Sequence, residues 1–447
     1  MNLHVGFDDT DSPRGGCTTY IAALLVEKLL NLGVKFVDYP NLIRLNPNVP
    51  WKTRGNGALC LRIRFAADML DLVFETIISA VEENSDMGFE ATDPGIVFLQ
   101  GARVPSALRE FAKNTIQSIT TIKDALKLVK RFKAEALGYG AGRGIIGALA
   151  AVGGVLEGDY TYELIAYRRP ENRGTQREVD HHSIEEMDRK TIDSTFNNID
   201  PETKRILITP RGPDPILYGI RGETEKAVLH AHSLVRPLEP VERYVLFRTN
   251  QGTDAHLRRV ENIAAIKEHE SVIVSGTVSS PPRVIPRRHR IFSLEDHTGS
   301  VDCAAFEPTG TLRKIASKLT VGDQLEVYGA ARSSKEYPDT LNLEKIHVCR
   351  LAIKVAWRNP KCPHCGKSMK SVGRGQGFQC ARCGHQSPSL QKRMVMEPRN
   401  LTERLYITSP RSQRHLTKPL CRYDREKTGK RLTMFDGWQH SYTTEEE

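Results

Sequence analysis

Three aspartates, Asp8, Asp9 and Asp11, lie within four consecutive positions directly after a short apolar stretch at residues 3–7. Carboxylates this close together cannot all stay ionised without a counter-cation, and Mg²⁺ is the ion that oxygen ligands and nucleotide phosphates share. Such an ion bridges phosphate oxygens and neutralises the charge that develops in phosphoryl transfer. The pattern therefore predicts a site that uses ATP and magnesium, with the three aspartates as catalytic residues and metal ligands.

The elements around these aspartates are suited to holding phosphate. Residues 3–7 predict a strand, and apolar periodicity predicts a helix from about residue 18 to residue 32. Backbone N–H groups at a helix N-terminus bind phosphate oxygens, and glycines before it allow a close approach. The residues predicted to bind ATP are Ser12, Gly15, Gly16, Lys52 and Arg143.

Two other interpretations of the acidic loop stay open. One is a helix cap with a solvated acidic turn, although capping needs only a single Asp or Thr. The other is an aspartyl-phosphate hydrolase in which Asp9 is the nucleophile, although the lysine and second acidic pair of that fold are not evident. The chain contains no G-x-x-x-x-G-K-[ST] motif, which excludes a P-loop enzyme.

Residues 142–147, which include Arg143, match the pattern G-x-G-x-x-G. In a dinucleotide-binding fold this pattern follows a strand, whereas residues 120–137 before it predict a helix. The context therefore favours close packing or an anion-binding loop over dinucleotide binding.

Four cysteines form two C-x-x-C pairs separated by 14 residues, namely Cys362, Cys365, Cys380 and Cys383. Four thiolates at this spacing complete a closed tetrahedral zinc site, and the residues between the pairs predict a short hairpin. So small a ribbon buries little core, so the metal supplies its folding energy. Trp357 and Phe378 are expected to be available for stacking on single-stranded RNA. The basic ribbon residues predicted to bind tRNA are Lys367, Lys370, Arg374 and Arg382.

Residues 270–350 alternate between short apolar strands and turns, with a short helix predicted at residues 312–319. Five strands and one helix in this order are typical of an OB-fold of the anticodon-binding type. Three arginines at a predicted strand edge are further candidates for tRNA binding, namely Arg287, Arg288 and Arg290.

The chain has 447 residues and a net charge of +10. Residues 350–447 carry 20 Lys and Arg against 8 Asp and Glu, a net of +12, which leaves −2 for the rest and points to a polyanionic partner. Nine cysteines in an odd, mostly scattered set fit a reducing compartment. No segment is long and apolar enough for a membrane span, and no signal peptide is evident, so a cytoplasmic location is expected.

Several unusual motifs in one order resemble the archaeal isoleucine-tRNA agmatinylcytidine synthetase (TiaS) family over essentially the whole chain. Besides the barrel and the ribbon, they are GFDDTDSPRGGCTTY (6–20), NLIRLNPNVPWKTRGNGA (41–58), GYGAGRGIIGALAA (138–151), RGPDPILYGIRGE (211–223), FRTNQGTDAHL (247–257) and RHLTKPL (414–420).

The resemblance implies an ATP-dependent C–N ligase that attaches agmatine to C2 of the wobble cytidine of isoleucine tRNA with a CAU anticodon, so that AUA is decoded. It implies that Thr18 becomes phosphorylated and that Asp8, Asp9 and Asp11 hold metal and nucleotide. The fold class is multidomain α+β. Its expected parts are a kinase-like α/β domain (1–135), a ferredoxin-like domain (136–265), an OB-fold (266–350), a zinc ribbon (351–395) and a basic C-terminal tail (396–447).

Agmatine carries a guanidinium group, which favours a planar carboxylate partner. Three acidic residues in the family-like motifs are candidates, namely Asp214, Glu223 and Asp254. No obligate protein partner and no membrane are expected. A non-catalytic tRNA-binding protein and an aspartyl-phosphate-type hydrolase remain the alternatives.

Overall fold

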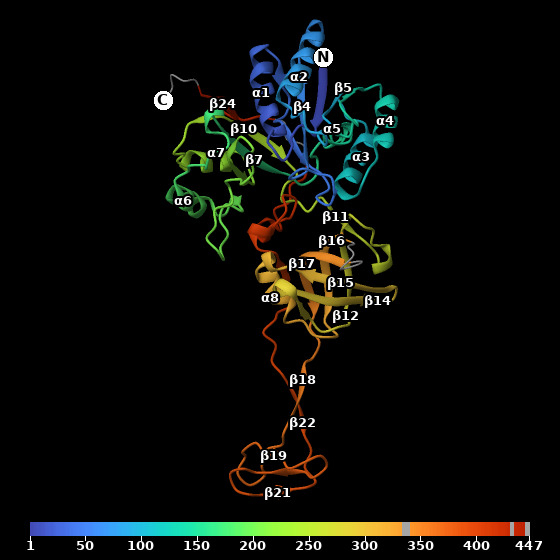
Figure 1. Cartoon of the computed structure of the whole chain (residues 1–447), viewed down its shortest axis with the longest axis vertical. Helices are drawn as coiled ribbons and strands as arrows, with labels where there is room; N and C mark the ends of the chain where they lie inside the picture. The colour runs from blue at the N-terminus through green and yellow to red at the C-terminus, as the bar shows by residue number, and fades with distance from the viewer. Residues whose placement is uncertain (333–339, 430–432, 443–447) are drawn as a thin grey trace.

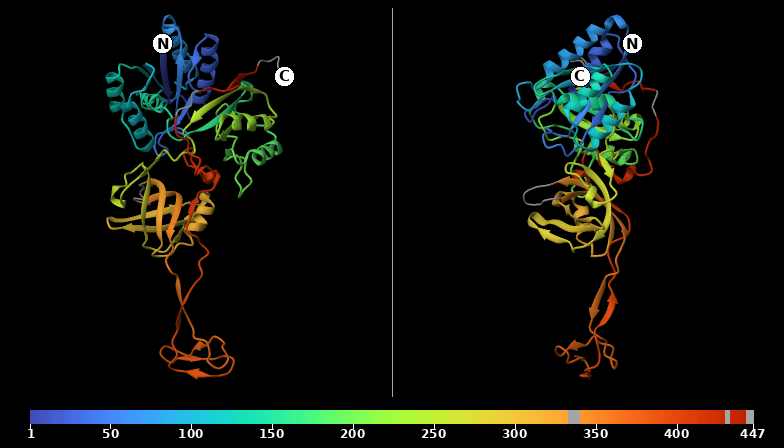
Figure 2. Two further views of the ribbon diagram at one scale, coloured as in Figure 1. Left: turned by 180° about the vertical axis from the view of Figure 1, so that it is seen from behind. Right: turned by 90° about the vertical axis from the view of Figure 1, so that its right-hand side faces the viewer.

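The computed structural model describes residues 1–332, 340–429 and 433–442. The molecule is elongated: two α/β domains lie at one end, a β-barrel in the middle, and a small ribbon at the other end of a thin two-stranded stalk (Figure 1). Views from behind and from the side show the same order along the long axis (Figure 2). No helix in the described ranges is long and apolar enough to cross a membrane.

The first domain is built around β1 (Asn2–Asp8), which pairs antiparallel with β4 and β5. Because side chains alternate along a strand, Leu3, Val5 and Phe7 enter one core with α1 and α2, whereas Gly6 faces the backbone of α5 on the other side. The helices of this domain are α1 (Thr18–Asn31), α2 (Leu70–Asn84), α3 (Ser106–Gln117), α4 (Ile122–Arg131) and α5 (Gly144–Gly153). Its strands besides β1 are β2 (Lys35–Phe36), β3 (Asn41–Arg44), β4 (Gly57–Arg64), β5 (Gly95–Gln100) and β6 (Glu135–Gly138).

The second domain continues the same sheet, because β10 pairs in parallel with β3. Its elements are β7 (Thr161–Arg168), α6 (His181–Thr191), β8 (Thr195–Phe196), β9 (Ile216–Gly222), α7 (Glu225–Leu234) and β10 (Val241–Thr249). The strand order across both domains is β6-β5-β1-β4-β3-β10-β7-β9-β8. The boundary predicted at residue 135 falls within this continuous sheet and stays a prediction.

The strand predicted at residues 3–7 and the helix predicted at residues 18–32 are confirmed as β1 and α1. The helix predicted at residues 120–137 is correct only as far as Arg131, where α4 ends. Lys133 then adopts a left-handed conformation with φ 52°, which reverses the chain and starts the edge strand β6. A local apolar pattern does not distinguish such a strand from one more helical turn.

The predicted OB-fold is confirmed by a closed five-stranded barrel, in which β12 pairs with both β16 and β14 and β15 pairs in parallel with β17. The helix α8 (Thr311–Ala316) packs on it. The barrel strands are β12 (Ser271–Val278), β14 (His289–Asp296), β15 (Gly299–Ala305), β16 (Gln324–Arg332) and β17 (Thr340–Arg350), with β11 (Leu257–Arg259) and β13 (Arg283–Ile285) added at its edges.

Beyond the barrel, β18 (Val355–Arg358) and β22 (Arg393–Met396) form the stalk. The ribbon holds β19 (Lys370–Ser371), β20 (Phe378–Gln379) and β21 (Gln386–Ser387), and the predicted hairpin is confirmed by the pairing of β19 with β20. In the predicted basic tail, β23 (Leu405–Ile407) pairs with the barrel strand β17 and β24 (Gln439–Ser441) pairs with β10. The segment after the ribbon thus returns to the α/β domains.

Candidate functional site

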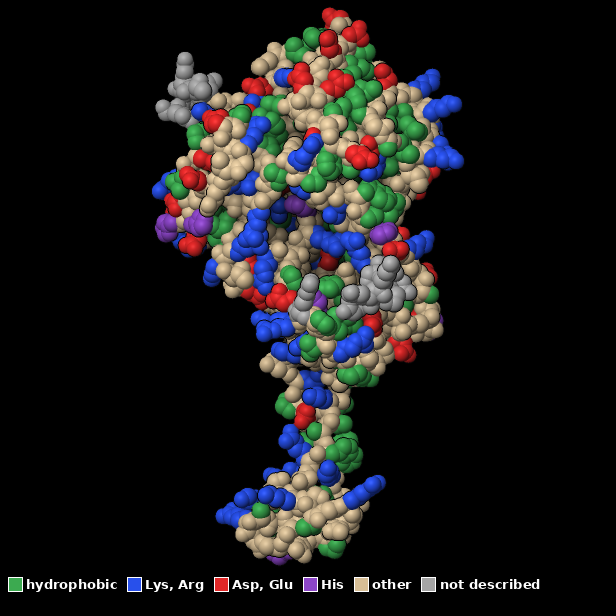
Figure 3. Space-filling view, in the orientation of Figure 1, with side chains coloured by type: hydrophobic (Ala, Val, Ile, Leu, Met, Phe, Trp, Pro, Cys, Tyr) green, Lys and Arg blue, Asp and Glu red, His purple; other side chains and the backbone are tan. Residues whose placement is uncertain are grey.

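A cavity of about 440 Å³ lies where the two α/β domains meet the C-terminal segment. Its wall includes the three aspartates of the N-terminal loop, Thr18 at the start of α1, the loop at residues 51–57 and the sheet of the second domain. Basic side chains flank the hollow between these domains and the barrel on the face seen in Figure 3. The cavity brings residues from three distant parts of the chain together.

The three aspartates have separate neighbours. The Arg143 guanidinium lies 3.0 Å from Oδ2 of Asp9, and Nε of Arg54 donates to Oδ2 of Asp11 at 2.8 Å. Asp8 lies against α5. Among the described residues, only the four ribbon cysteines bring three or more candidate ligand atoms within 4.8 Å of one another, so the aspartates diverge instead of forming a compact cluster.

Asp9 and Asp11 each pair with an arginine, whereas Asp8 lies against α5 and has the least compensating positive charge of the three. Burial, with a further contribution from the negative charges of Asp9 and Asp11, raises the pKa of Asp8 to about 8. Burial also raises the pKa of Asp9, although Arg143 opposes that shift. Since a nearby cation favours an ionised carboxylate, the chemistry of this donor set fits a divalent ion that arrives with nucleotide phosphate.

Thr18 is the first residue of α1, and its buried Oγ1 lies 3.0 Å from Oγ1 of Thr10. It lines the cavity together with the aspartates, so a hydroxyl group lies in the same space as the predicted nucleotide site. Of the predicted ATP-binding residues, Lys52 and Arg143 belong to the cavity wall. The others form the turn beside it: Ser12 and Gly15 bond to each other through their backbones, and the Gly16 carbonyl accepts from Arg54 at 2.6 Å.

The glycine-rich segment at residues 142–147 is confirmed as a close-packing element. A Cβ atom at Gly144 would lie 2.4 Å from the backbone nitrogen of Gly95, and one at Gly147 would lie 1.7 Å from Oδ2 of Asp8. Asp93, which sequence reasoning missed, accepts from the backbone N–H of Ala141 at 2.9 Å and anchors this loop. A single aspartate before a buried strand has no spacing that would have identified it.

Of the three candidates for agmatine, the structure brings only Asp214 to the cavity, where it lies 3.2 Å from Arg177 and 3.6 Å from Arg54. Burial raises its pKa despite these two guanidinium groups. Glu223 instead pairs with Arg422 and Lys427, and Asp254 pairs with Lys345, all outside the cavity wall. Glu223 therefore holds the C-terminal segment, and Asp254 joins the barrel to that segment, because its Oδ1 also accepts from the backbone N–H of Lys418 at 2.7 Å.

The second-domain wall holds a polar cluster that sequence reasoning also missed. Glu163 in β7 is 3% exposed and accepts from Nε of Arg221 at 2.9 Å. Gln251 donates to the same carboxylate, Arg44 lies 3.8 Å from it, and His415 approaches from the C-terminal segment. The one carboxylate inside a largely apolar strand, residues 161–168, was the available signal for this cluster.

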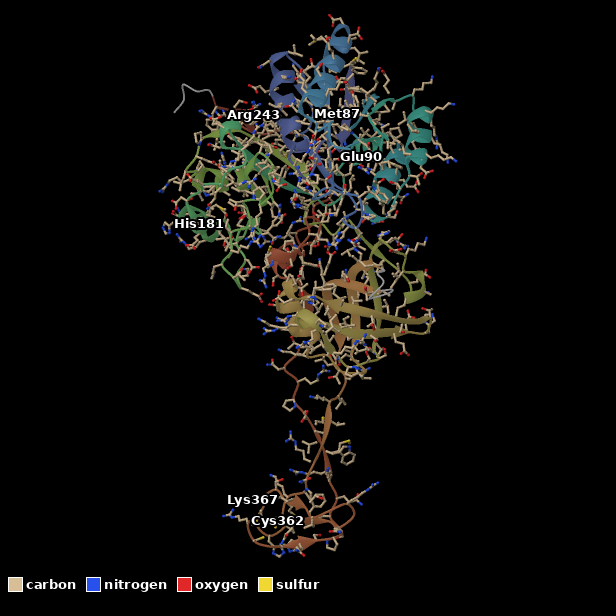
Figure 4. The ribbon with its side chains drawn as sticks, in the orientation of Figure 1. Met87, Glu90, His181, Arg243, Cys362 and Lys367 are labelled. Atoms are coloured by element: carbon tan, nitrogen blue, oxygen red, sulfur yellow. The ribbon has the colours of Figure 1, made fainter. Side chains whose placement is uncertain are left out.

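The four cysteines of the ribbon face one another, with 3.5 Å between Sγ of Cys362 and Cys383 and 3.4 Å between Sγ of Cys365 and Cys380. Four thiols at these distances fit a tetrahedral zinc ion. Figure 4 shows Cys362 and Lys367 at the far end of the molecule from the labelled residues of the α/β domains. The ribbon is therefore a module apart from the cavity.

The predicted tRNA-binding residues of the ribbon are all exposed, namely Lys367, Lys370, Arg374 and Arg382. Trp357 on the stalk is 65% exposed and available for stacking. The expectation for Phe378 is wrong, because its ring is buried with Met369 in the small core of the ribbon. On the barrel, Arg288 and Arg290 lie next to the edge strand β13, and the side chain of Arg287 lies outside the described residues.

The fold and the site thus define a multidomain protein in which a cavity lined by carboxylates, basic side chains and a buried hydroxyl group is joined to two modules of types that bind nucleic acid. Four family descriptions match in the same order: the TiaS TCKD domain (4–69), the TiaS FLD domain (142–256), an OB-fold nucleic acid binding domain (272–348) and the TiaS C-terminal zinc ribbon domain (359–401).

A relative from Pyrococcus horikoshii, a tRNA 2-agmatinylcytidine synthetase named TiaS, is 46% identical over 94% of this chain and 97% of its own length. A protein of the same name from Methanosarcina mazei is 42% identical over the same shares of the two chains. A solved complex of TiaS with an isoleucine tRNA and ATP matches with a TM-score of 0.85 at 39% identity, covering 97% of this chain and 99% of that one. The chain belongs to the TiaS family. The kinase-like character of its first domain stays a prediction.

Proposed function

We propose that this protein is an ATP-dependent ligase that attaches agmatine to C2 of the wobble cytidine of isoleucine tRNA with a CAU anticodon, which lets that tRNA decode AUA. The relatives are named for 2-agmatinylcytidine synthesis, and a solved TiaS structure with an isoleucine tRNA, AMPCPP and agmatine matches with a TM-score of 0.83 over 97% of this chain. The observation that carries the proposal is the single cavity in which Asp8, Asp9, Asp11 and Thr18 face Asp214 of the second domain. A protein that acts on tRNA in this way is expected in the cytoplasm.

The reaction needs activation, because the C2 oxygen of cytosine is a poor leaving group until ATP converts it into a phosphorylated or adenylylated one. The amine of agmatine can then displace it. When bound, magnesium would neutralise phosphate charge, and the side chains that would hold it are Asp8, Asp9 and Asp11. Arg143 and Lys52 supply positive charge for phosphate oxygens at the cavity wall. Asp214 offers a carboxylate for the guanidinium group of agmatine.

The RNA modules hold the substrate at a distance from the chemistry. The wobble base lies in a single-stranded loop, so unstacking it into the cavity costs only about a few kcal/mol. The barrel arginines Arg288 and Arg290 and the zinc-stabilised ribbon would bind the tRNA backbone and keep the loop at the cavity. Lys367, Lys370, Arg374 and Arg382 are the ribbon side chains proposed for this contact.

Incubation with γ-labelled ATP separates this proposal from its alternatives. Label on Thr18 supports the synthetase, label on a carboxylate supports a phosphatase-like hydrolase, and no label contradicts both. Agmatine and a tRNA transcript are then added, and the mass of the nucleoside at the wobble position identifies the product.

We predict that Thr18→Ala removes the label and the product, because the hydroxyl group that is proposed to accept the phosphoryl group is lost. The affinity for tRNA should stay unchanged, since the RNA modules lie elsewhere. Thr18→Ser, which keeps a hydroxyl group, is the matched control and should still be labelled. A parallel loss of tRNA affinity in a filter-binding assay would make the loop a binding element instead.

A further inference from the structure

His415 is a cavity residue that belongs to neither α/β domain. It reaches the wall from the C-terminal segment, after that segment has passed the barrel strand β17. Its backbone is fixed on the second domain, because Gly252 donates to the carbonyl of His415 and Asp254 donates to that of Leu416, each at 2.8 Å. The imidazole is thus held rigidly in a cavity whose other walls come from residues far away in the sequence.

The hydrogen-bond network assigns the proton of this imidazole. The side-chain amide of Gln251 donates its N–H to the Glu163 carboxylate, so its Oε1 is the atom that faces Nδ1 of His415, at 2.9 Å. Two acceptors at this distance would repel each other, so Nδ1 carries the hydrogen. Nη2 of Arg221, which can only donate, also lies 3.2 Å from Nδ1, but the shorter contact with Oε1 of Gln251 decides the tautomer, and Nε of the same guanidinium donates to Glu163.

The other ring nitrogen, Nε2, is therefore an acceptor. It lies beside Gly55, another cavity residue, where a Cβ atom would be only 2.7 Å from it. In the part of the chain that the structure describes, no hydrogen bond is made to Nε2. Burial, with the positive charges of Arg44, Arg221 and Lys52, holds the pKa of His415 well below its usual range, so the ring stays neutral near pH 7. The site thus presents one fixed acceptor to a ligand.

The charges around His415 decide what kind of ligand fits. Three cations, Arg44, Arg221 and Lys52, surround it, against the single carboxylate of Glu163. A cationic guanidinium or ammonium group would be repelled there, whereas a neutral N–H donor would not. On its Watson–Crick edge cytosine carries such a donor, its exocyclic N4 amino group, whereas uracil has an acceptor oxygen at that position.

We propose that Nε2 of His415 accepts a hydrogen bond from the exocyclic amino group of the reacting cytosine and so selects cytidine over uridine. His415 is then a specificity-determining residue for the base, and Gln251 and Glu163 are positioning residues that fix its tautomer. The inference rests on the proposed function, because it takes the reacting base to be cytosine. It adds that the C-terminal segment supplies part of the base pocket.

The test uses the full-length, zinc-loaded protein and three tRNA transcripts that differ only at the reacting nucleoside. One carries cytidine, one carries its 4-deamino analogue, which keeps the C2 oxygen but lacks the amino group, and one carries uridine. For the wild-type protein, kcat/KM should fall about tenfold to a hundredfold on the analogue, because an acceptor in the pocket is left unpaired. If the wild-type protein uses the analogue within twofold of cytidine, the inference is overturned without any variant.

Variants of His415 test whether this residue causes the preference for cytidine over the analogue. His415→Ala should be slower on cytidine and should use cytidine and the analogue equally, whereas His415→Gln, which can present an amide oxygen, should recover part of the preference. If His415→Ala keeps the full preference, or only raises the KM for agmatine, His415 does not read the base. Melting temperature and tRNA affinity are measured alongside to show that each variant is folded. Absence of product from wild-type protein and the cytidine transcript would instead reject the proposed function.

Discussion

At the scale of single residues, the position of Asp8 depends on the absence of a side chain at Gly147. α5 lies so close to the ends of β1 and β5 that a Cβ atom at Gly144 would overlap Gly95 of β5, and one at Gly147 would overlap the side chain of Asp8. The close approach places a carboxyl group with a raised pKa at the cavity wall beside the start of a helix. The glycine pattern therefore serves Asp8 through packing and not by binding a dinucleotide.

Gly147→Ala should abolish most of the activity and lower stability by about 1–3 kcal/mol. The added methyl group would lie 1.7 Å from Oδ2 and 2.6 Å from Cγ of Asp8, so the carboxylate must move away. A misplacement of about 1 Å can cost roughly a hundredfold in rate. The measurement is kcat/KM beside a thermal melt. Gly158→Ala is the control, since a Cβ atom there has no neighbour within 4 Å, and equal losses in both variants would contradict the explanation.

Because His232 in α7 is buried, we expect the free energy of unfolding to depend on pH. Burial lowers the pKa of His232 to about 4, while its Nδ1 lies 2.9 Å from the hydroxyl group of Tyr218. The unfolded chain takes up this proton near pH 6.5, so the free energy of unfolding is unaffected above that pH and falls as the pH drops towards 4. The contribution is up to about 3 kcal/mol.

Urea unfolding between pH 7.5 and pH 4.5 measures this contribution. His232→Gln, which can still bond to Tyr218, should unfold with a smaller loss of stability over that range than the wild-type protein. His181→Gln, at an exposed position in α6, should leave the slope unchanged. An unchanged slope in both variants would show that His232 titrates normally in the folded protein.

At the scale of elements, the ribbon and its stalk are the part of the molecule that is least stable without a bound metal. An isolated two-stranded sheet is marginally stable in water, and the buried core of the ribbon is little more than Met369, Phe378 and two of its cysteines. The free energy of metal binding is therefore the free energy of folding for this module. The OB barrel, in contrast, closes on its own core.

Cys362→Ser should unfold the ribbon alone. The body of the protein should keep its melting temperature, because its cores share no residue with the ribbon core. The bound zinc should be lost and tRNA affinity should weaken, as measured by metal analysis and filter binding. Cys349→Ser, an exposed cysteine outside the cluster, is the control. Unfolding of the whole chain would contradict the modular arrangement.

At the scale of the whole molecule, the C-terminal segment holds the barrel and the two α/β domains together. Arg422 is fully buried and pairs with Asp159 at 2.9 Å and Glu223 at 2.6 Å, and nearby Lys345 of the barrel pairs with Asp254 of the second domain. The same segment places His415 in the cavity. From its composition this segment is predicted only to be a basic tail, but in the structure it connects the barrel to the α/β domains.

Arg422→Ala should destabilise the α/β domains by about 3–5 kcal/mol, because it removes the buried guanidinium between two carboxylates and leaves each with only a lysine partner, Lys427 for Glu223 and Lys418 for Asp159. Denaturant unfolding measures the loss. Combining it with Glu223→Gln should recover part of the stability, since one of the two carboxylates that lost the guanidinium is made neutral. Arg425→Ala, which removes an exposed side chain nearby, should change stability by no more than about 0.5 kcal/mol. Equal effects of the two arginine variants would refute the role of Arg422.

The sequence by itself was sufficient to identify the four cysteines of the ribbon, the acidic loop, the OB-fold and the order of the domains. These features depend on short spacings: two thiols two residues apart can bind one ion, and a strand followed by a turn and a helix places Asp8, Asp9 and Thr18 near one another. The tertiary structure alone decided that Asp214 lies in the cavity, while Glu223 binds the C-terminal segment and Asp254 binds both that segment and the barrel. It alone brought Glu163, Gln251 and His415 together, because their contacts join residues far apart in the chain and follow from the packing of whole domains.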